Sequence, residues 1–135
     1  MQSRILVATL ALLASLVVGV AATKSAPDPV RKWAIVNLME PTSIAGMFVS
    51  GSVMFVHDDA RMARGEPCTG VYRFNPGQGP AEEIVSFHCK PRWGRAPQKF
   101  TASTARDPMG PRVLTEFQFA ADEEAHRVPD RLNKY

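Results

Sequence analysis

The sequence has few cysteines and little excess charge, and each scarcity excludes a class of protein. Two cysteines in 135 residues cannot build a disulfide-rich scaffold or a four-cysteine zinc site. The net charge of +3, from 16 basic and 13 acidic residues, gives no electrostatic reason to expect a nucleic-acid partner. Neither a Gly-x-Ser-x-Gly elbow nor a Gly-x-x-x-x-Gly-Lys phosphate loop occurs. We therefore predict no catalytic residues and no cofactor, and the missing motifs disfavour enzymatic activity without deciding the question.

The one long apolar run lies at the N-terminus, over residues 5–20. Arg4 precedes the run, and the small residues Gly19-Val20-Ala21-Ala22 follow it. This order predicts a secretory signal peptide over residues 1–22, cleaved after Ala22. The alternative is a retained signal anchor, which the run disfavours because it is shorter than the ~20 residues of a spanning helix. We expect an exported mature protein, periplasmic or extracellular, with no transmembrane segment.

The rest of the chain has the pattern of an all-β protein. Short runs rich in Val, Ile and Phe alternate with Pro and Gly, which predicts a small antiparallel barrel or sandwich of about six strands. We expect a flexible lead-in over residues 23–31, a single β domain over residues 32–129 and a tail over residues 130–135. The strands are expected at residues 33–40, 46–57, 68–74, 82–89, 100–106 and 112–120.

One short helix is expected over residues 58–64. Asp58 and Asp59 suit a helix N-cap and first turn, and Gly65 suits the stop. The predicted core consists of large apolar residues from the strands: Trp33, Ile35, Val49, Val53, Phe55, Tyr72, Val85, Phe87, Leu114, Phe117 and Phe119. Strand alternation places Phe117 and Phe119 on one face and Leu114 on the other.

The two cysteines, Cys68 and Cys89, are predicted to pair across a hairpin. The midpoint between them falls between Gln78 and Gly79, inside a Pro/Gly-rich stretch where a turn is expected. That register sets Gly70 opposite Phe87 and Tyr72 opposite Val85. Directly opposed residues lie within the Cα range of a disulfide, and an exported protein meets an oxidising compartment. We therefore expect a disulfide; the alternative is a pair of thiolates that bind a metal together with His88.

A metal site is the second hypothesis drawn from the polar residues. His57 is followed by two acids, His88 adjoins Cys89, and His126 follows an acidic run. Imidazole, carboxylate and thiolate groups are ordinary ligands for zinc and copper. The candidate metal ligands are His57, Asp58, His88 and His126. Their spacing matches no compact metal motif, and a blue-copper site is rejected because no His and Met closely follow Cys89.

A basic segment surrounds Trp93 and is the candidate site for an anionic ligand. Residues 90–106 hold five cations and no acid. An indole flanked by cations suits an anion or a lipid headgroup. The alternative is a solvated, irregular loop, which Pro91 and Pro97 favour. The candidate ligand-binding residues are Lys90, Arg92, Trp93, Arg95 and Lys99.

Three segments resemble small exported bacterial proteins that share the motif H-D-x-x-R-M-A-x-G-x-P-C. The motif occurs here from His57 to Cys68, and Phe87-His88-Cys89 and His126-Arg127-Val128-Pro129 match the same group's pattern. The resemblance covers about residues 33–129 and implies bacterial export, but no activity.

The leading functional hypothesis is an exported β domain that acts as a binding or interaction module. Its partner would be an anionic ligand or an envelope component. The alternatives are a metal-dependent protein or enzyme that uses the histidines, and a structural envelope protein.

Overall fold

The computed structural model describes residues 29–106 and 108–132, and it confirms an all-β fold with one short helix. The predicted signal peptide lies outside these residues. Among the described residues, no helix is long and apolar enough to cross a membrane. The elements are β1 (Arg31–Ile44), β2 (Met47–Asp58), α1 (Asp59–Ala63), β3 (Thr69–Asn75), β4 (Gly79–Phe87), β5 (Lys90–Trp93), β6 (Thr101–Arg106), β7 (Arg112–Gln118) and β8 (Glu124–Arg127).

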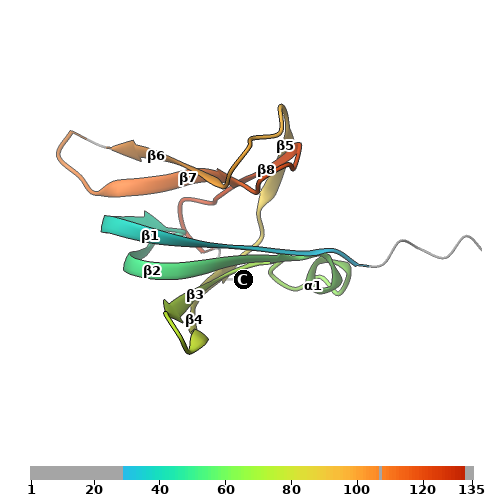
Figure 1. Ribbon diagram of the computed structural model, residues 1–135. Coiled ribbons are helices and arrows are strands. Elements are labelled where there is room, and N and C mark those ends of the chain that lie inside the picture. Colours follow the sequence, from blue (N-terminus) through green and yellow to red (C-terminus); the bar gives the residue numbers. More distant parts are fainter. Residues whose placement is uncertain (1–28, 107, 133–135) are drawn as a thin grey trace, which may run out of the picture.

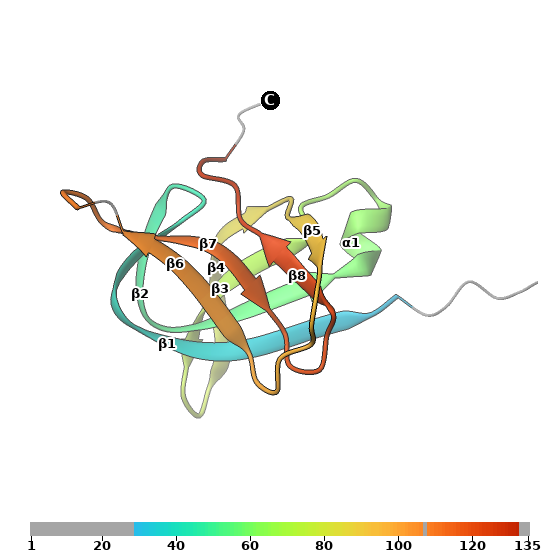
Figure 2. The same ribbon diagram turned by 90° about the horizontal axis from the view of Figure 1, so that it is seen from above.

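The strands form two layers that face each other like a sandwich. The strand order is β4-β3-β2-β1-β7-β8-β5, and β6 pairs with the other side of β7. In Figure 1 the β1–β4 layer lies below the layer of β5, β6, β7 and β8. The two layers are joined where β1 pairs in parallel with β7, at Thr42 and Ser43. Figure 2, seen from above, shows β6, β7 and β8 crossing over the longer strands β1 and β2.

Large apolar side chains fill the space between the layers. Eight residues of the predicted core are buried: Val49, Val53, Phe55, Val85, Phe87, Leu114, Phe117 and Phe119. Leu114 and Phe117 are both buried because β7 is irregular where Ser103 pairs with Glu116 and Thr104 with Leu114. At this point β7 has one residue more than β6. The extra residue breaks the strict alternation, which had placed Leu114 and Phe117 on opposite faces.

Three predicted core residues are not in the core. Trp33 is 62% exposed and Ile35 is 44% exposed, because the inward residues of β1 are the even-numbered Ala34, Val36 and Leu38. Tyr72 is half-buried, and its hydroxyl donates to Glu83 at 2.8 Å. A two-residue period fixes which residues share a face, but it does not say which face is covered.

The strands differ from prediction most clearly in a longer β1 and in two additional short strands. Pro41 does not end β1, because the pairing of β1 with β2 shifts between Leu38 and Thr42 and leaves Pro41 without a ladder partner. Strands β5 and β8 were not predicted, because each is four residues long and lacks a hydrophobic alternation. These two strands pair with each other and carry part of the site described below.

The predicted register of the β3–β4 hairpin is wrong by one residue. Gly70 pairs with Ser86 and Val71 with Val85, and the pairing shifts again on either side of Tyr72. A one-residue shift turns the side chains of one strand over relative to those of the other, and here it is β3 that is turned. Val71, which is fully buried, therefore faces the core in place of Tyr72.

Helix α1 is confirmed with the predicted cap. The Asp58 carboxylate accepts from the backbone N–H groups of Ala60 and Arg61, at 2.9 and 3.4 Å. Gly65 has φ +73°, a left-handed conformation that suits a helix stop. The Asp58 N–H donates to the Cys68 carbonyl at 2.9 Å. The helix and its cap thus return the chain to the end of β2 and set Cys68 beside His57.

Candidate metal centre

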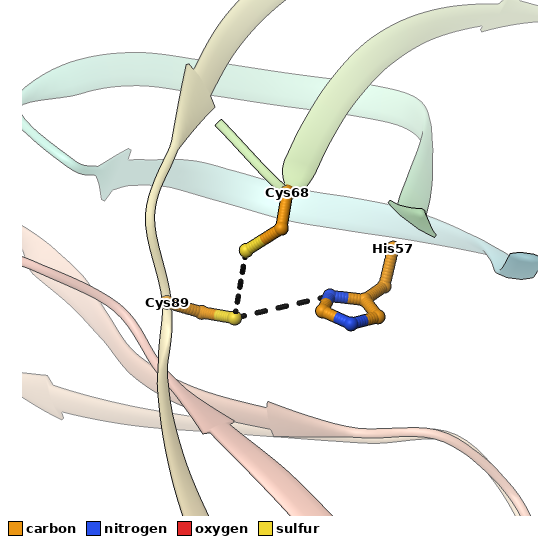
Figure 3. A group of neighbouring side chains, drawn as sticks. All are labelled: His57, Cys68 and Cys89. Atoms are coloured by element: carbon orange, nitrogen blue, oxygen red, sulfur yellow. Dashed lines mark hydrogen bonds between the residues drawn. The ribbon is translucent and has the colours of Figure 1, made fainter. Parts of the chain in front are cut away.

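Four side chains from four segments meet at one end of the sandwich interior. His57 lies near the end of β2, and Cys68 comes just before β3. Cys89 lies between β4 and β5, and His126 lies on β8. Figure 3 shows His57, Cys68 and Cys89 pointing toward one another. Since these segments belong to both layers, the cluster depends on the whole fold.

The ligand atoms of three of these residues lie close together. The Sγ atoms of Cys68 and Cys89 are 3.3 Å apart, and Cys89 Sγ is 3.8 Å from His57 Nδ1. One ligand atom from each residue lies within 4.8 Å of the other two. His126 joins the cluster through Cys89, whose Sγ lies 3.4 Å from His126 Nδ1. The cysteines are therefore neighbours, as predicted, and both are free thiols.

His57 is buried, and its Nε2 atom contacts a carboxylate on the side of the ring away from the cysteines. Its Nε2 lies 3.1 Å from the Asp59 carboxylate, and its ring is 2% exposed. A carboxylate at Nε2 favours a proton there and leaves the Nδ1 lone pair facing the cysteines. Burial lowers the pKa of His57, but the hydrogen bond and charge of Cys68 and the charge of Asp59 outweigh it, so the pKa is raised. A carboxylate at the outer ring nitrogen is the common partner of a histidine that binds a metal through its other nitrogen.

His126 is fully buried and is only partly satisfied. Its ring stacks on Phe117 with centroids 4.9 Å apart, and it lies 4.4 Å from the His57 ring. Its Nε2 is buried without a hydrogen-bond partner. Burial, with help from the charge of His57, lowers the pKa of His126 to about 4. His126 is therefore neutral at physiological pH, with one nitrogen directed to Cys89.

The contact between the two thiols shifts their pKa values in opposite directions. The Cys89 thiol lowers the pKa of Cys68 to about 3 by hydrogen bonding to its sulfur, and His57 adds to the effect. The same contact raises the pKa of Cys89. Cys68 is thus a ready thiolate, the form that binds metals. Cys89 must lose its proton to bind a metal ion.

The observed separations fit a tetrahedral metal site. Zinc bonds of about 2.3 Å to sulfur and about 2.0 Å to nitrogen imply about 3.8 Å between two sulfur ligands and about 3.5 Å between sulfur and nitrogen. The Cys68–Cys89 separation of 3.3 Å is about 0.5 Å below the first value, and the Cys89–His57 separation of 3.8 Å is close to the second. The third pair, Cys68 and His57, has its ligand atoms within 4.8 Å of each other.

Not all of the predicted metal ligands belong to this cluster. Asp58 caps α1, and His88 is exposed. The acid that contacts His57 is Asp59, which the sequence suggested only as part of the helix's first turn. Cys68 and Cys89 supply the sulfur ligands, although the sequence favoured a disulfide for them. No spacing signal marks the set, because its members lie 11, 21 and 37 residues apart in the chain.

Two cations of the basic segment are paired with acids from other strands. Arg92 is paired with Glu116, and Arg106 is paired with Glu40. Trp93 is 70% exposed, while Arg95 and Lys99 lie in the connection between β5 and β6. Lys90 differs from the others because it lines the same cavity as Cys89.

Comparison with known protein families, curated proteins and solved structures finds no match to this chain.

Proposed function

We propose that this protein binds one soft or borderline transition-metal ion, Zn²⁺ or Cu⁺, through His57, Cys68 and Cys89. The observation that carries the proposal is the convergence of two sulfurs and one imidazole nitrogen, all within 4.8 Å, at a largely buried point. Thiolate and imidazole ligands favour these ions over Mg²⁺ or Ca²⁺, which prefer oxygen.

The buried histidines support a metal over a purely structural role for the cysteines. A disulfide needs no imidazole beside it, and burying an imidazole nitrogen without a partner costs about 1–3 kcal/mol. Here two imidazoles are 2% and 0% exposed, and each directs Nδ1 toward Cys89. His57 Nδ1 has only long contacts, to the Thr69 hydroxyl at 3.4 Å and to Cys89 Sγ at 3.8 Å, and a metal ion would replace them with a bond.

Metal titration of the reduced protein tests the proposal. In the absence of oxygen, equilibrium dialysis against zinc with elemental analysis should give one equivalent per chain. Cys89→Ser and His57→Gln should each weaken binding by more than about a hundredfold, since even an outer partner of a metal ligand contributes 10- to 100-fold.

The matched control is His88→Gln, which changes the exposed histidine beside Cys89 and should keep one equivalent with unchanged affinity. No zinc bound by the fully reduced chain would refute the proposal. Equal losses in His88→Gln and His57→Gln would refute the ligand assignment.

A Cys68–Cys89 disulfide is the second candidate, favoured by the 3.3 Å approach of the sulfurs. A disulfide needs about 2.05 Å, so the sulfurs would move together by about 1.2 Å. The bond would form by exchange with a partner disulfide, which would be reduced to two thiols. The exported location that favours it remains a prediction from residues 1–22. Intact mass under non-reducing conditions separates the candidates: the disulfide form is two hydrogens lighter and binds no metal.

A further inference from the structure

A cavity of about 920 Å³ lies against the Cys89 side of the cluster. It is lined by the chain from Ser86 to Lys90 together with Pro67, and by the chain from Arg127 to Leu132. This volume falls within the range of small-molecule sites, ~300–1,000 Å³. The cavity is therefore large enough for a ligand of several heavy atoms.

Both segments contribute cations to the lining of this cavity. Lys90 comes from the first segment, and Arg127 and Arg131 come from the second. Within the described part of the chain, Asp130 is the one carboxylate of the lining, and neither Lys90 nor Arg131 forms an ion pair. Arg127 lies 3.9 Å from Glu116, which offsets part of its charge. The remaining positive charge favours an anionic occupant.

Cys89 connects the cavity with the proposed metal centre. It lines the cavity, and its sulfur contacts Cys68, His57 and His126. Cys89 is partly exposed, whereas the other three residues are at most 2% exposed. A ligand can therefore approach from the side of Cys89. The group whose ligand atoms all lie within 4.8 Å of one another is His57, Cys68 and Cys89, without His126, so a fourth tetrahedral position is left to be filled.

We propose that the cavity binds a small anionic thiol that completes the coordination of the metal. This inference rests on the proposed metal centre. The charged end, such as a carboxylate, meets Lys90 and Arg131, and the sulfur binds the metal. In this step the S–H bond breaks and a sulfur–metal bond forms. The proton passes to solvent, a water molecule leaves the fourth position, and no oxidation occurs.

Two thiols that differ in charge test the inference on cobalt-loaded protein under anaerobic conditions. The probes are 3-mercaptopropionate, which carries a carboxylate, and 2-mercaptoethanol, which carries a neutral hydroxyl. The sulfur-to-cobalt absorption bands report each binding event. We expect 3-mercaptopropionate to half-saturate at a concentration at least about tenfold lower, as one charge-assisted contact allows.

Charge variants assign that preference to the cavity. The double variant Lys90→Gln with Arg131→Gln should remove the advantage of the anionic thiol and keep the cobalt stoichiometry. The matched control, Arg95→Gln with Lys99→Gln, removes two cations that do not line the cavity and should keep the advantage.

The outcomes separate this inference from the proposed function. Cobalt that binds without sulfur-to-cobalt bands would overturn the metal centre itself. Bands that appear but respond to neither thiol would overturn the inference alone. Equal half-saturation by both thiols, or an advantage that survives in the Lys90/Arg131 variant, would overturn the anionic recognition.

Discussion

The interior of the sandwich has two ends of opposite chemistry. At one end Phe55, Phe100, Phe117 and Phe119 pack ring against ring, with Phe55 and Phe117 centroids 5.1 Å apart. At the other end His57, Cys68 and His126 are buried and Cys89 is partly exposed. Phe117 and Phe119 link the two ends, since the His126 ring stacks on Phe117 and meets Phe119 edge to face.

The difference between the ends indicates where stability and function reside. The phenylalanine end needs no ligand, because packing contacts alone stabilise apolar rings. The histidine–cysteine end leaves a ring nitrogen of His126 unpartnered and brings thiols close without bonding them. Polar groups of this kind are costly to bury unless a ligand joins them. Substitutions at the first end should therefore reduce stability, and substitutions at the second should reduce metal affinity.

The largest expected effect is at the phenylalanine end. Phe55→Ala removes a fully buried ring, so the free energy of unfolding should fall by about 3–5 kcal/mol. Denaturant unfolding of the reduced, metal-free protein measures this. Phe55→Leu is the milder variant if the alanine variant does not fold. The zinc affinity of Phe55→Leu should equal that of the unsubstituted protein. A large loss of zinc affinity in folded Phe55→Leu would mean that the two ends are not separable.

The next effect is a pH dependence confined to the histidine end. Because the native pKa of His126 is about 4, the unfolded chain binds a proton below pH 6.5 that the native chain does not. The stability of the metal-free protein should therefore fall from pH 6.5 toward pH 4, by up to roughly 3 kcal/mol from this group. The raised pKa of His57 acts in a different window, where its stabilisation is lost as the pH rises above 6.5.

His126→Gln measures the contribution of His126 to this pH dependence. Urea unfolding at intervals from pH 7 to pH 4 should show a shallower fall in the variant. The carboxylates contribute equally to both proteins and cancel in the comparison. Identical profiles for the two proteins would contradict the account of His126.

Features of the fold that follow from repeated local sequence signals were predicted correctly, and features that depend on irregular strand pairing were not. Repeated local signals, such as Val/Phe-rich strands, Pro/Gly turns and the Asp58 cap, were sufficient for the fold class and the helix. The hairpin register was missed because irregular pairing near Tyr72 breaks the constant spacing that the prediction assumed. Trp33 and Ile35 were misplaced because alternation alone does not show which face of β1 is covered.

The site was partly within reach of the sequence and partly beyond it. Cys68, Cys89, His57 and His126 were each singled out, but on two separate hypotheses. Their convergence depends on the pairing of β5 with β8, two short strands without a sequence signal. Asp59 could not be distinguished from Asp58, because their roles depend on the turn at the start of α1.

The smallest expected effect is that of a substitution at Asp59, whose carboxylate contacts Nε2 of His57. Asp59→Asn should weaken zinc binding by about 10- to 100-fold, with little change in stability, because the side chain is half-exposed. The neighbouring Asp58→Asn is the control: asparagine also caps helices, so zinc affinity and stability should be nearly unchanged. Competition with a chromophoric chelator measures the affinities. Equal weakening in both variants would exclude a specific role for Asp59.

The most direct test of the metal centre is zinc X-ray absorption spectroscopy on the reduced, loaded protein. The account predicts two sulfur ligands at about 2.3 Å and at least one imidazole nitrogen at about 2.0 Å. One of the two sulfurs should disappear in Cys89→Ser. A shell of oxygen and nitrogen alone, without sulfur, would contradict the assignment of Cys68 and Cys89 as metal ligands.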